Sequence, residues 1–199
     1  MEAAFRQDRD FLHVPPHAHG ATVIKYFTCP AYPRVQEAHT FQSDNMRRAF
    51  TSCLGVNGTR ADYSDGVLFL DSRVRLSAIN DGTSNTLAVG ERPPSGDFVF
   101  GWWYAGWGQH QDGEADLVLG AKTRNTSVWG ETCGQTGPFE YKAGQFTDPC
   151  ASFQYWSPHP GGAHFLLADG SVRFLTYSAG GLLPALATRS GGEAAGLPD

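Results

Sequence analysis

The sequence predicts an α+β fold that is mostly antiparallel β, with long loops and little helix. Glycine and proline supply 24 and 12 of the 199 residues, which indicates many turns and short strands. Aromatic residues make up 13% of the chain and favour the pleated surface of a sheet. The chain has only two methionines and few runs of Leu, Ala, Glu and Lys, which argues against a helical bundle.

In the first half of the chain, apolar runs between turn residues predict short strands. The run 22–28 should end as a strand at the prolines of "CPAYP", because proline cannot continue a sheet ladder. Polar residues 35–50 predict a loop with one helical turn. The expected elements are a helical turn within 2–12, strands at 22–28, 51–56 and 66–70, and a half-buried strand or an extended segment at 72–79.

The best hairpin signal is "HFLLADGSVRFLT", residues 164–176, in which two apolar strands flank Asp169 and Gly170. "DGTSNT" (81–86) predicts a capped turn before a strand. The other expected elements are strands at 87–91 and 98–110, a long irregular excursion over 111–150 and a helical turn at 184–188.

Charge and hydropathy exclude two classes of partner. The net charge is −5 and the only concentrated basic spot is Arg47-Arg48, so we expect no nucleic-acid binding. No run of about 18 apolar residues is present, and the first 20 residues do not form a signal peptide. We therefore expect no membrane contact from this chain.

The four cysteines predict disulfides. Cys29, Cys53, Cys133 and Cys150 include no C-x-x-C pair, which excludes a zinc ribbon and a thioredoxin motif. The nearest-neighbour pairing is Cys29–Cys53 with Cys133–Cys150, although three pairings are open and free buried thiols are the alternative. An oxidised chain would belong outside the cytoplasm, at the cell surface or in the periplasm.

Five motifs in fixed order carry a family resemblance. They are "YFTCPAYPR" (26–34), "GVLFLDSRVRL" (66–76), "DGTSNTLAVGER" (81–92), the H-X9-DG segment from His159 to Asp169-Gly170, and "ALATRSGGE" (185–193). Together they resemble a planctomycete-rich family of prepilin-like proteins, the domain of unknown function 1559, which also carries a solute-binding label.

The resemblance implies a pseudopilin-like protein of type II secretion or type IV pili. Such a protein opens with a basic leader and a long apolar helix, which a β-rich head follows. This chain shows neither leader nor helix, so it resembles the C-terminal two-thirds of a member. We expect a polar segment at 1–22, a head domain at 23–193 and a tail at 194–199. The resemblance implies no catalytic residue.

His159 has two interpretations. As a general base or ligand it would be oriented by Asp169. As a structural residue, which we favour, its ring would bond backbone groups and fix the Pro160-Gly161-Gly162 corner. Asp169 and Gly170 are explained by turn chemistry, since glycine accepts positive φ.

Three segments are weaker metal candidates. In the "DGTSNTLAVGER" motif, which contains Asp81, Gly82, Asn85 and Glu91, alternate oxygens suggest a calcium loop. Position 12 of that loop is Arg92 instead of glutamate, so a hydrogen-bonded turn is favoured. Asp112, Glu114 and Asp116 have a spacing that suits calcium or a solvated loop. His13, His17 and His19 lack a Cys or acidic partner for a transition metal.

Trp102, Trp103 and Trp107 fit either a sugar-stacking platform or core packing. Three functions follow. The first is a non-catalytic pilin-like head that contacts other pilin-like or secretion-system proteins. The second is an extracytoplasmic module that binds glycans or solutes through the tryptophans. The third is a hydrolase built on His159 and Asp169.

Overall fold

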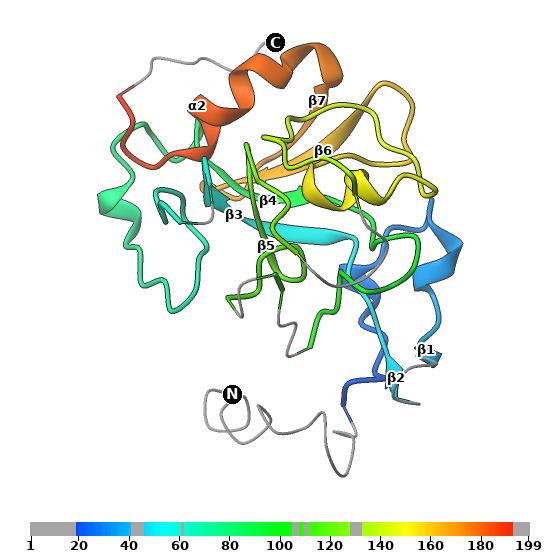
Figure 1. Ribbon diagram of the computed structural model, residues 1–199. Coiled ribbons are helices and arrows are strands. Elements are labelled where there is room, and N and C mark those ends of the chain that lie inside the picture. The colour runs from blue at the N-terminus through cyan, green and yellow to red at the C-terminus, as the bar shows by residue number, and fades with distance from the viewer. Residues whose placement is uncertain are drawn as a thin grey trace.

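The computed structural model describes residues 19–40, 46–60, 62–104, 108–109, 112–127 and 133–192 (Figure 1). Its strands are β1 (His39–Thr40), β2 (Arg47–Arg48), β3 (Cys53–Gly58), β4 (Leu87–Glu91), β5 (Val118–Gly120), β6 (Gly162–Leu167) and β7 (Val172–Thr176). The α-helix is α2 (Leu183–Ala187), and 3-10 helices span Lys25–Phe27, Pro33–Val35, Leu76–Ala78, Pro149–Phe153 and Tyr177–Leu182.

Five strands form the central sheet in the order β5-β3-β4-β6-β7. All neighbours are antiparallel except β3 and β5, which run parallel. β1 and β2 form a separate antiparallel pair. The predicted α+β class with mostly antiparallel strands is therefore confirmed.

One face of the sheet, which we call the inner face, carries the core. Leu54 and Val56 of β3 and Phe165 and Leu167 of β6 are almost completely buried there. The short helix α2 covers this face and adds Leu183 and Leu186 to the same cluster (Figure 1).

The predicted hairpin is confirmed. β6 and β7 pair from Gly162↔Thr176 to Leu166↔Val172, and Gly170 adopts a φ of 88° in the connecting turn. That positive φ is open to glycine without a steric penalty, which explains the Asp-Gly pair. The strands predicted at 51–56 and 87–91 and the helical turn predicted at 184–188 also form, as β3, β4 and α2.

Two predicted strands are wrong. Residues 22–28 fold as a loop with the 3-10 helix Lys25–Phe27, in which Tyr26 is 96% exposed. Residues 66–70 donate two backbone bonds to β3, to Asn57 and Val56, and then turn at Asp71, whose φ is 57°. Of the two alternatives for residues 72–79, the structure shows no strand: the segment has no partner strand among the described residues, is extended at Arg75 and then enters a 3-10 helix.

The aromatic segment 98–110 is also not a strand over its described part. Positive φ values at Phe98 and Gly101 break the extended backbone, which leaves a single bridge between Trp102 and Phe50. Within 35–50, the strand pair β1–β2 occurs where a loop with a helical turn was predicted. The helical turn predicted within 2–12, His13, His17, Trp107 and the tail 194–199 lie outside the described residues.

Candidate functional site

The corner before β6 holds His159 in place through Ser157. The Ser157 Oγ accepts a bond from the His159 N–H at 3.1 Å and donates to the Gly162 carbonyl at 2.7 Å. Tyr177 fastens the same corner, because its hydroxyl donates to the Ser157 carbonyl at 3.1 Å. The backbone of His159 is thus fixed without help from its ring.

The His159 ring instead faces two side chains from distant segments. Its Nε2 lies 3.4 Å from the Sγ of Cys29, in the loop after the first 3-10 helix. The same nitrogen lies 3.4 Å from Oε1 of Glu91, the last residue of β4. We call these three residues, Cys29, Glu91 and His159, the Cys-Glu-His cluster.

Glu91 is held by the neighbouring strand. Its Oε2 accepts a 2.6 Å bond from the His164 N–H and lies 3.1 Å from the His164 Nδ1. This leaves Oε1 turned toward His159. The side chain of Glu91 is 12% exposed and that of His159 is 29% exposed, so the cluster lies at the margin of the fold.

The thiols at this site are poor nucleophiles. Burial, helped by the Glu91 carboxylate, raises the pKa of Cys29. Burial, Glu91 and Cys29 together raise the pKa of Cys53 to about 12. A reactive cysteine needs a lowered pKa, so the arrangement does not suit a protease-like nucleophile.

The favoured interpretation of His159 is wrong in one respect: its ring does not bond the corner backbone, because Ser157 does. The hydrolase pair is also separated. Asp169 follows the far end of β6, about 20 Å of strand from the corner, and its Oδ1 accepts bonds from the Ser171 N–H and hydroxyl. The sequence does contain a signal for the residues that contact the His159 ring. Cys29, Glu91 and His159 each lie in one of the five motifs.

The disulfide prediction is half confirmed. Cys133 and Cys150 form a bridge, with their Cα atoms 4.7 Å apart. The nearest-neighbour bridge Cys29–Cys53 is not formed, and both residues are free thiols. The Cys29 thiol is directed at His159 instead.

The "DGTSNT" motif is a hydrogen-bonded turn, and the structure explains its residues. The Asp81 carboxylate accepts bonds from the Gly191 and Gly192 N–H groups at 2.7 and 2.9 Å, while the Asn85 amide donates to the Asp81 carbonyl. Gly82 has a φ of 93°. The Asp169 N–H donates to the Thr83 carbonyl, so this turn, the hairpin turn and the last motif meet at one end of the sheet.

The acidic residues of the calcium candidate do not converge. Asp116 is 3% exposed and its carboxylate accepts the N–H groups of Gly101, Trp102 and Gly108. Glu114 points to Gln109 and Thr123, and Asp112 accepts the N–H of Glu114. Within the described part of the chain, the Cys-Glu-His cluster is the group whose ligand atoms come together.

The described tryptophans are used in packing. The Arg48 guanidinium lies 3.7 Å from the centre of the Trp102 ring, and the Trp102 indole donates to the Phe98 carbonyl. The Trp103 indole donates to the Thr22 carbonyl at 2.7 Å. Both residues are half-buried, and the Arg48 guanidinium occupies one face of the Trp102 ring.

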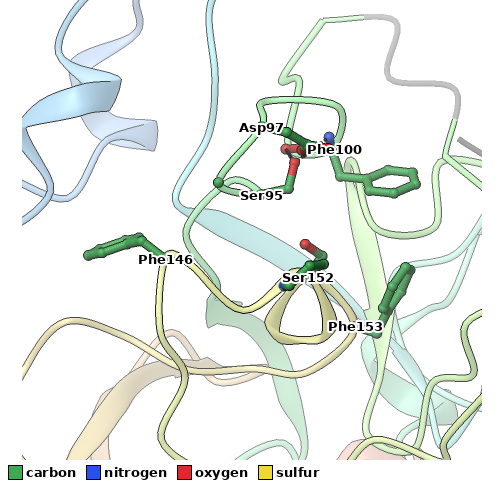
Figure 2. Close-up of a pocket in the computed structure, with 8 residues that line it drawn as sticks. Ser95, Asp97, Phe100, Phe146, Ser152 and Phe153 are labelled. Atoms are coloured by element: carbon green, nitrogen blue, oxygen red, sulfur yellow. Dashed lines mark hydrogen bonds between the residues drawn. The ribbon is translucent and has the colours of Figure 1, made fainter. Parts of the chain in front are cut away.

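Two hollows lie near the residues described above, one beside Phe100 and one beside His159. A pocket between the Ser95–Phe100 loop and the 3-10 helix Pro149–Phe153 has a volume of about 10 Å³ (Figure 2). That is room for about one water molecule. His159 lines a second, open groove together with Gly144, Trp156 and Tyr177.

Comparison with known proteins places the chain in a family. Residues 3–181 match SBP_bac_10, described as a protein of unknown function (DUF1559). The chain belongs to this family. No curated protein and no solved structure matches the DUF1559 chain. Over the described ranges, no helix has the length and apolar character needed to cross a membrane.

Proposed function

We propose that this DUF1559 chain is the non-catalytic head of a pilin-like surface protein, whose sheet packs against an apolar helix during assembly. The second face of the five-stranded sheet, which we call the outer face, is the observation that carries this proposal. On it lie the side chains that alternate with the inner core residues along β6 and β7.

The outer face carries an apolar row that is partly uncovered, beside the polar pair Glu91 and His164. The register places Val89, Leu166 and Val172 in one row across β4, β6 and β7. Phe174 stands beside that row, with its ring centre 5.0 Å from that of His164. Val172 is 61% exposed and Phe174 is 43% exposed, although both lie on a regular strand.

The row continues toward β5. Gly55 pairs with both Val89 and Val118, and Leu68 packs over it. Leu68 is 37% exposed and Leu70, which follows it, is 51% exposed. A continuous apolar strip on a sheet face is typical of a surface that another element covers, and a straight helix with one apolar side fits such a strip.

The chemistry of the described residues supports a non-catalytic role. Burial raises the pKa of Cys29 and so disfavours a free thiolate nucleophile in the metal-free chain, and His159 and Asp169 stand at opposite ends of β6. The Cys133–Cys150 bridge supports an oxidising compartment, either the cell surface or the periplasm. Other pilin-like or secretion-system proteins are therefore the partners we expect.

The alternative role, binding of glycans or solutes through residues 102–107, has less support. The face of Trp102 is occupied by Arg48, and the Trp103 indole is bonded to the backbone.

Site-specific photo-crosslinking in the cell that produces the protein tests the proposal. A photoreactive phenylalanine at Val172 should crosslink to a pilin-like protein, and peptide mapping should place the bond within an apolar helix. The matched control is Arg173, which is adjacent in the chain but directed to the other side of β7. Equal crosslinking at 172 and 173, or crosslinks at 172 outside any apolar helix, would contradict the proposal.

A further inference from the structure

We propose that Cys29, Glu91 and His159 bind one divalent transition-metal ion of the zinc class. This site goes beyond the assembly role, because it concerns ligand atoms beside the outer apolar strip and not the strip itself. One sulfur, one nitrogen and one carboxylate oxygen, each from a different segment, lie within 4.8 Å of one another.

Two of the three separations between these atoms match the edges of a metal tetrahedron. Metal bonds of about 2.3 Å to sulfur, about 2.1 Å to nitrogen and about 2.0 Å to oxygen place sulfur about 3.6 Å from nitrogen and nitrogen about 3.3 Å from oxygen at the tetrahedral angle. The observed distances are 3.4 Å from the Cys29 Sγ to the His159 Nε2 and 3.4 Å from that nitrogen to the Glu91 Oε1. The third separation, from the Cys29 Sγ to the Glu91 carboxylate, is within 4.8 Å, and binding an ion would bring it to about 3.5 Å.

The sulfur, nitrogen and oxygen ligand atoms determine which class of metal ion the cluster suits. A thiolate and an imidazole are ligands for zinc, cobalt, nickel or copper, whereas calcium and magnesium take oxygen ligands. The cluster offers a single carboxylate side chain, so it does not suit the oxygen-seeking ions. Three protein ligands leave a fourth position for water, and the 29% exposure of His159 gives solvent a path to it.

The Glu91 carboxylate is oriented by a neighbour, as metal ligands commonly are, and the backbones of Cys29 and His159 are anchored beside it. The Glu91 carboxylate is oriented by His164 through its N–H at 2.6 Å. The Cys29 N–H donates to the Ser52 hydroxyl at 3.2 Å, and the His159 N–H donates to the Ser157 hydroxyl at 3.1 Å. The site is therefore held before any ion arrives.

The ion would join parts of the chain that are far apart in sequence. Cys29 belongs to the loop that precedes the sheet, whereas Glu91 and His159 belong to β4 and to the corner before β6. Cys53 pairs with Glu91 across the strands and is the one other free cysteine. A Cys29–Cys53 disulfide would therefore compete with the ion for the same sulfur.

Cobalt titration tests the site directly. The full chain is stripped with a chelator under nitrogen, without reductant so that Cys133–Cys150 stays closed, and titrated with Co²⁺ and then Zn²⁺. We expect one ion per chain, a thiolate-to-cobalt charge-transfer absorption and its loss when zinc displaces cobalt. Cys29→Ser should remove the absorption, and His159→Ala should weaken zinc binding at least about 10-fold.

Two matched variants complete the test. Cys53→Ser, which cannot form the competing disulfide, should bind cobalt like the natural chain, and His39→Ala, outside the cluster, should also do so. If Cys29→Ser fails to fold, the binding loss in His159→Ala decides the question. The proposal is overturned if Cys53→Ser binds no metal, if the absorption survives in Cys29→Ser, if His159→Ala binds zinc unchanged, or if the protein from its own compartment contains a Cys29–Cys53 disulfide.

Discussion

The Sγ of Cys29 lies 3.4 Å from the Nε2 of His159, although 130 residues separate them in the chain. This contact joins the "YFTCPAYPR" motif to the H-X9-DG segment. The "ALATRSGGE" motif also contacts a distant segment, at the other end of the sheet. There the Arg189 guanidinium donates to the carbonyls of Ser64 and Gly66. The ordered motifs are thus the points at which distant segments meet.

Replacing Ser157 should destabilise the fold more than replacing His159 in metal-free protein. Ser157→Ala leaves the buried Gly162 carbonyl without its donor and the His159 N–H without its acceptor. We expect a loss of about 1–3 kcal/mol in the free energy of unfolding, measured by urea denaturation. His159→Ala should lose less than Ser157→Ala, because its ring lies at the margin of the fold.

Ser171→Ala is the matched control, since that hydroxyl bonds an exposed carboxylate at the other end of β6. It should change stability by less than about 0.5 kcal/mol. If Ser157→Ala costs no more than Ser171→Ala, the corner is not held as described.

The Cys133–Cys150 bridge should contribute strongly to stability. It closes a loop with a sequence separation of 17 residues in a region with little regular structure. Removing it in a Cys133→Ser/Cys150→Ser variant should cost about 3 kcal/mol, and reductant should then have no further effect. Cys53→Ser, which breaks no bridge, is the control. A double variant as stable as the natural chain would show that the bridge is absent in solution.

The strands that could be predicted from the sequence have two features. Their apolar residues follow a strand pattern, and the strand that pairs with them lies nearby in the sequence. The β6–β7 hairpin is specified by alternation on both sides of Asp169-Gly170, and its strands pair with each other. Residues 72–79 alternate equally well, but pairing depends on the rest of the fold, and no strand lies beside them in the described part. The parallel pair β3–β5 joins segments that share no local signal.

The residues of the candidate site could be predicted from the sequence, but their arrangement in space could not. His159 and Glu91 were singled out as motif residues and Cys29 as a disulfide candidate. Their proximity depends on the register of β4 with β6, which places Glu91 beside the corner. The 3-10 helix Lys25–Phe27, where a strand was predicted, precedes Cys29 and sets the path of its loop.

Asp116→Asn should be among the most damaging single changes. The carboxylate accepts three backbone N–H groups, and its charge is the main one that favours ionisation of the fully buried Arg92, whose guanidinium bonds the Pro93 and Ala115 carbonyls. The asparagine side chain would weaken these charge-assisted hydrogen bonds and remove the negative charge near Arg92, which should cost about 1.5–3 kcal/mol. Asp62→Asn, which breaks an exposed pair with Arg60, should cost less than about 1 kcal/mol. Similar losses in both variants would contradict this account.

Glu114 should make stability fall as the pH rises. Burial, with the Asp112 charge second, raises the pKa of Glu114 from 4.5 to about 7. Between these values the unfolded chain has released this proton while the folded chain still holds it, so each rise in pH favours unfolding. The stabilisation is complete below about pH 4.5 and is lost by about pH 7.

Glu114→Gln keeps a neutral amide in the same place at every pH. Urea denaturation from pH 4.5 to 8.5 should show the variant about 1–3 kcal/mol more stable than the natural chain at pH 8, with the difference shrinking toward zero at the acidic end. Glu140→Gln, an exposed partner of Lys122, should show no such trend. A constant difference between Glu114→Gln and the natural chain across this range would mean that the Glu114 carboxylate ionises alike in the folded and unfolded states, because only a difference in its pKa couples this proton to folding.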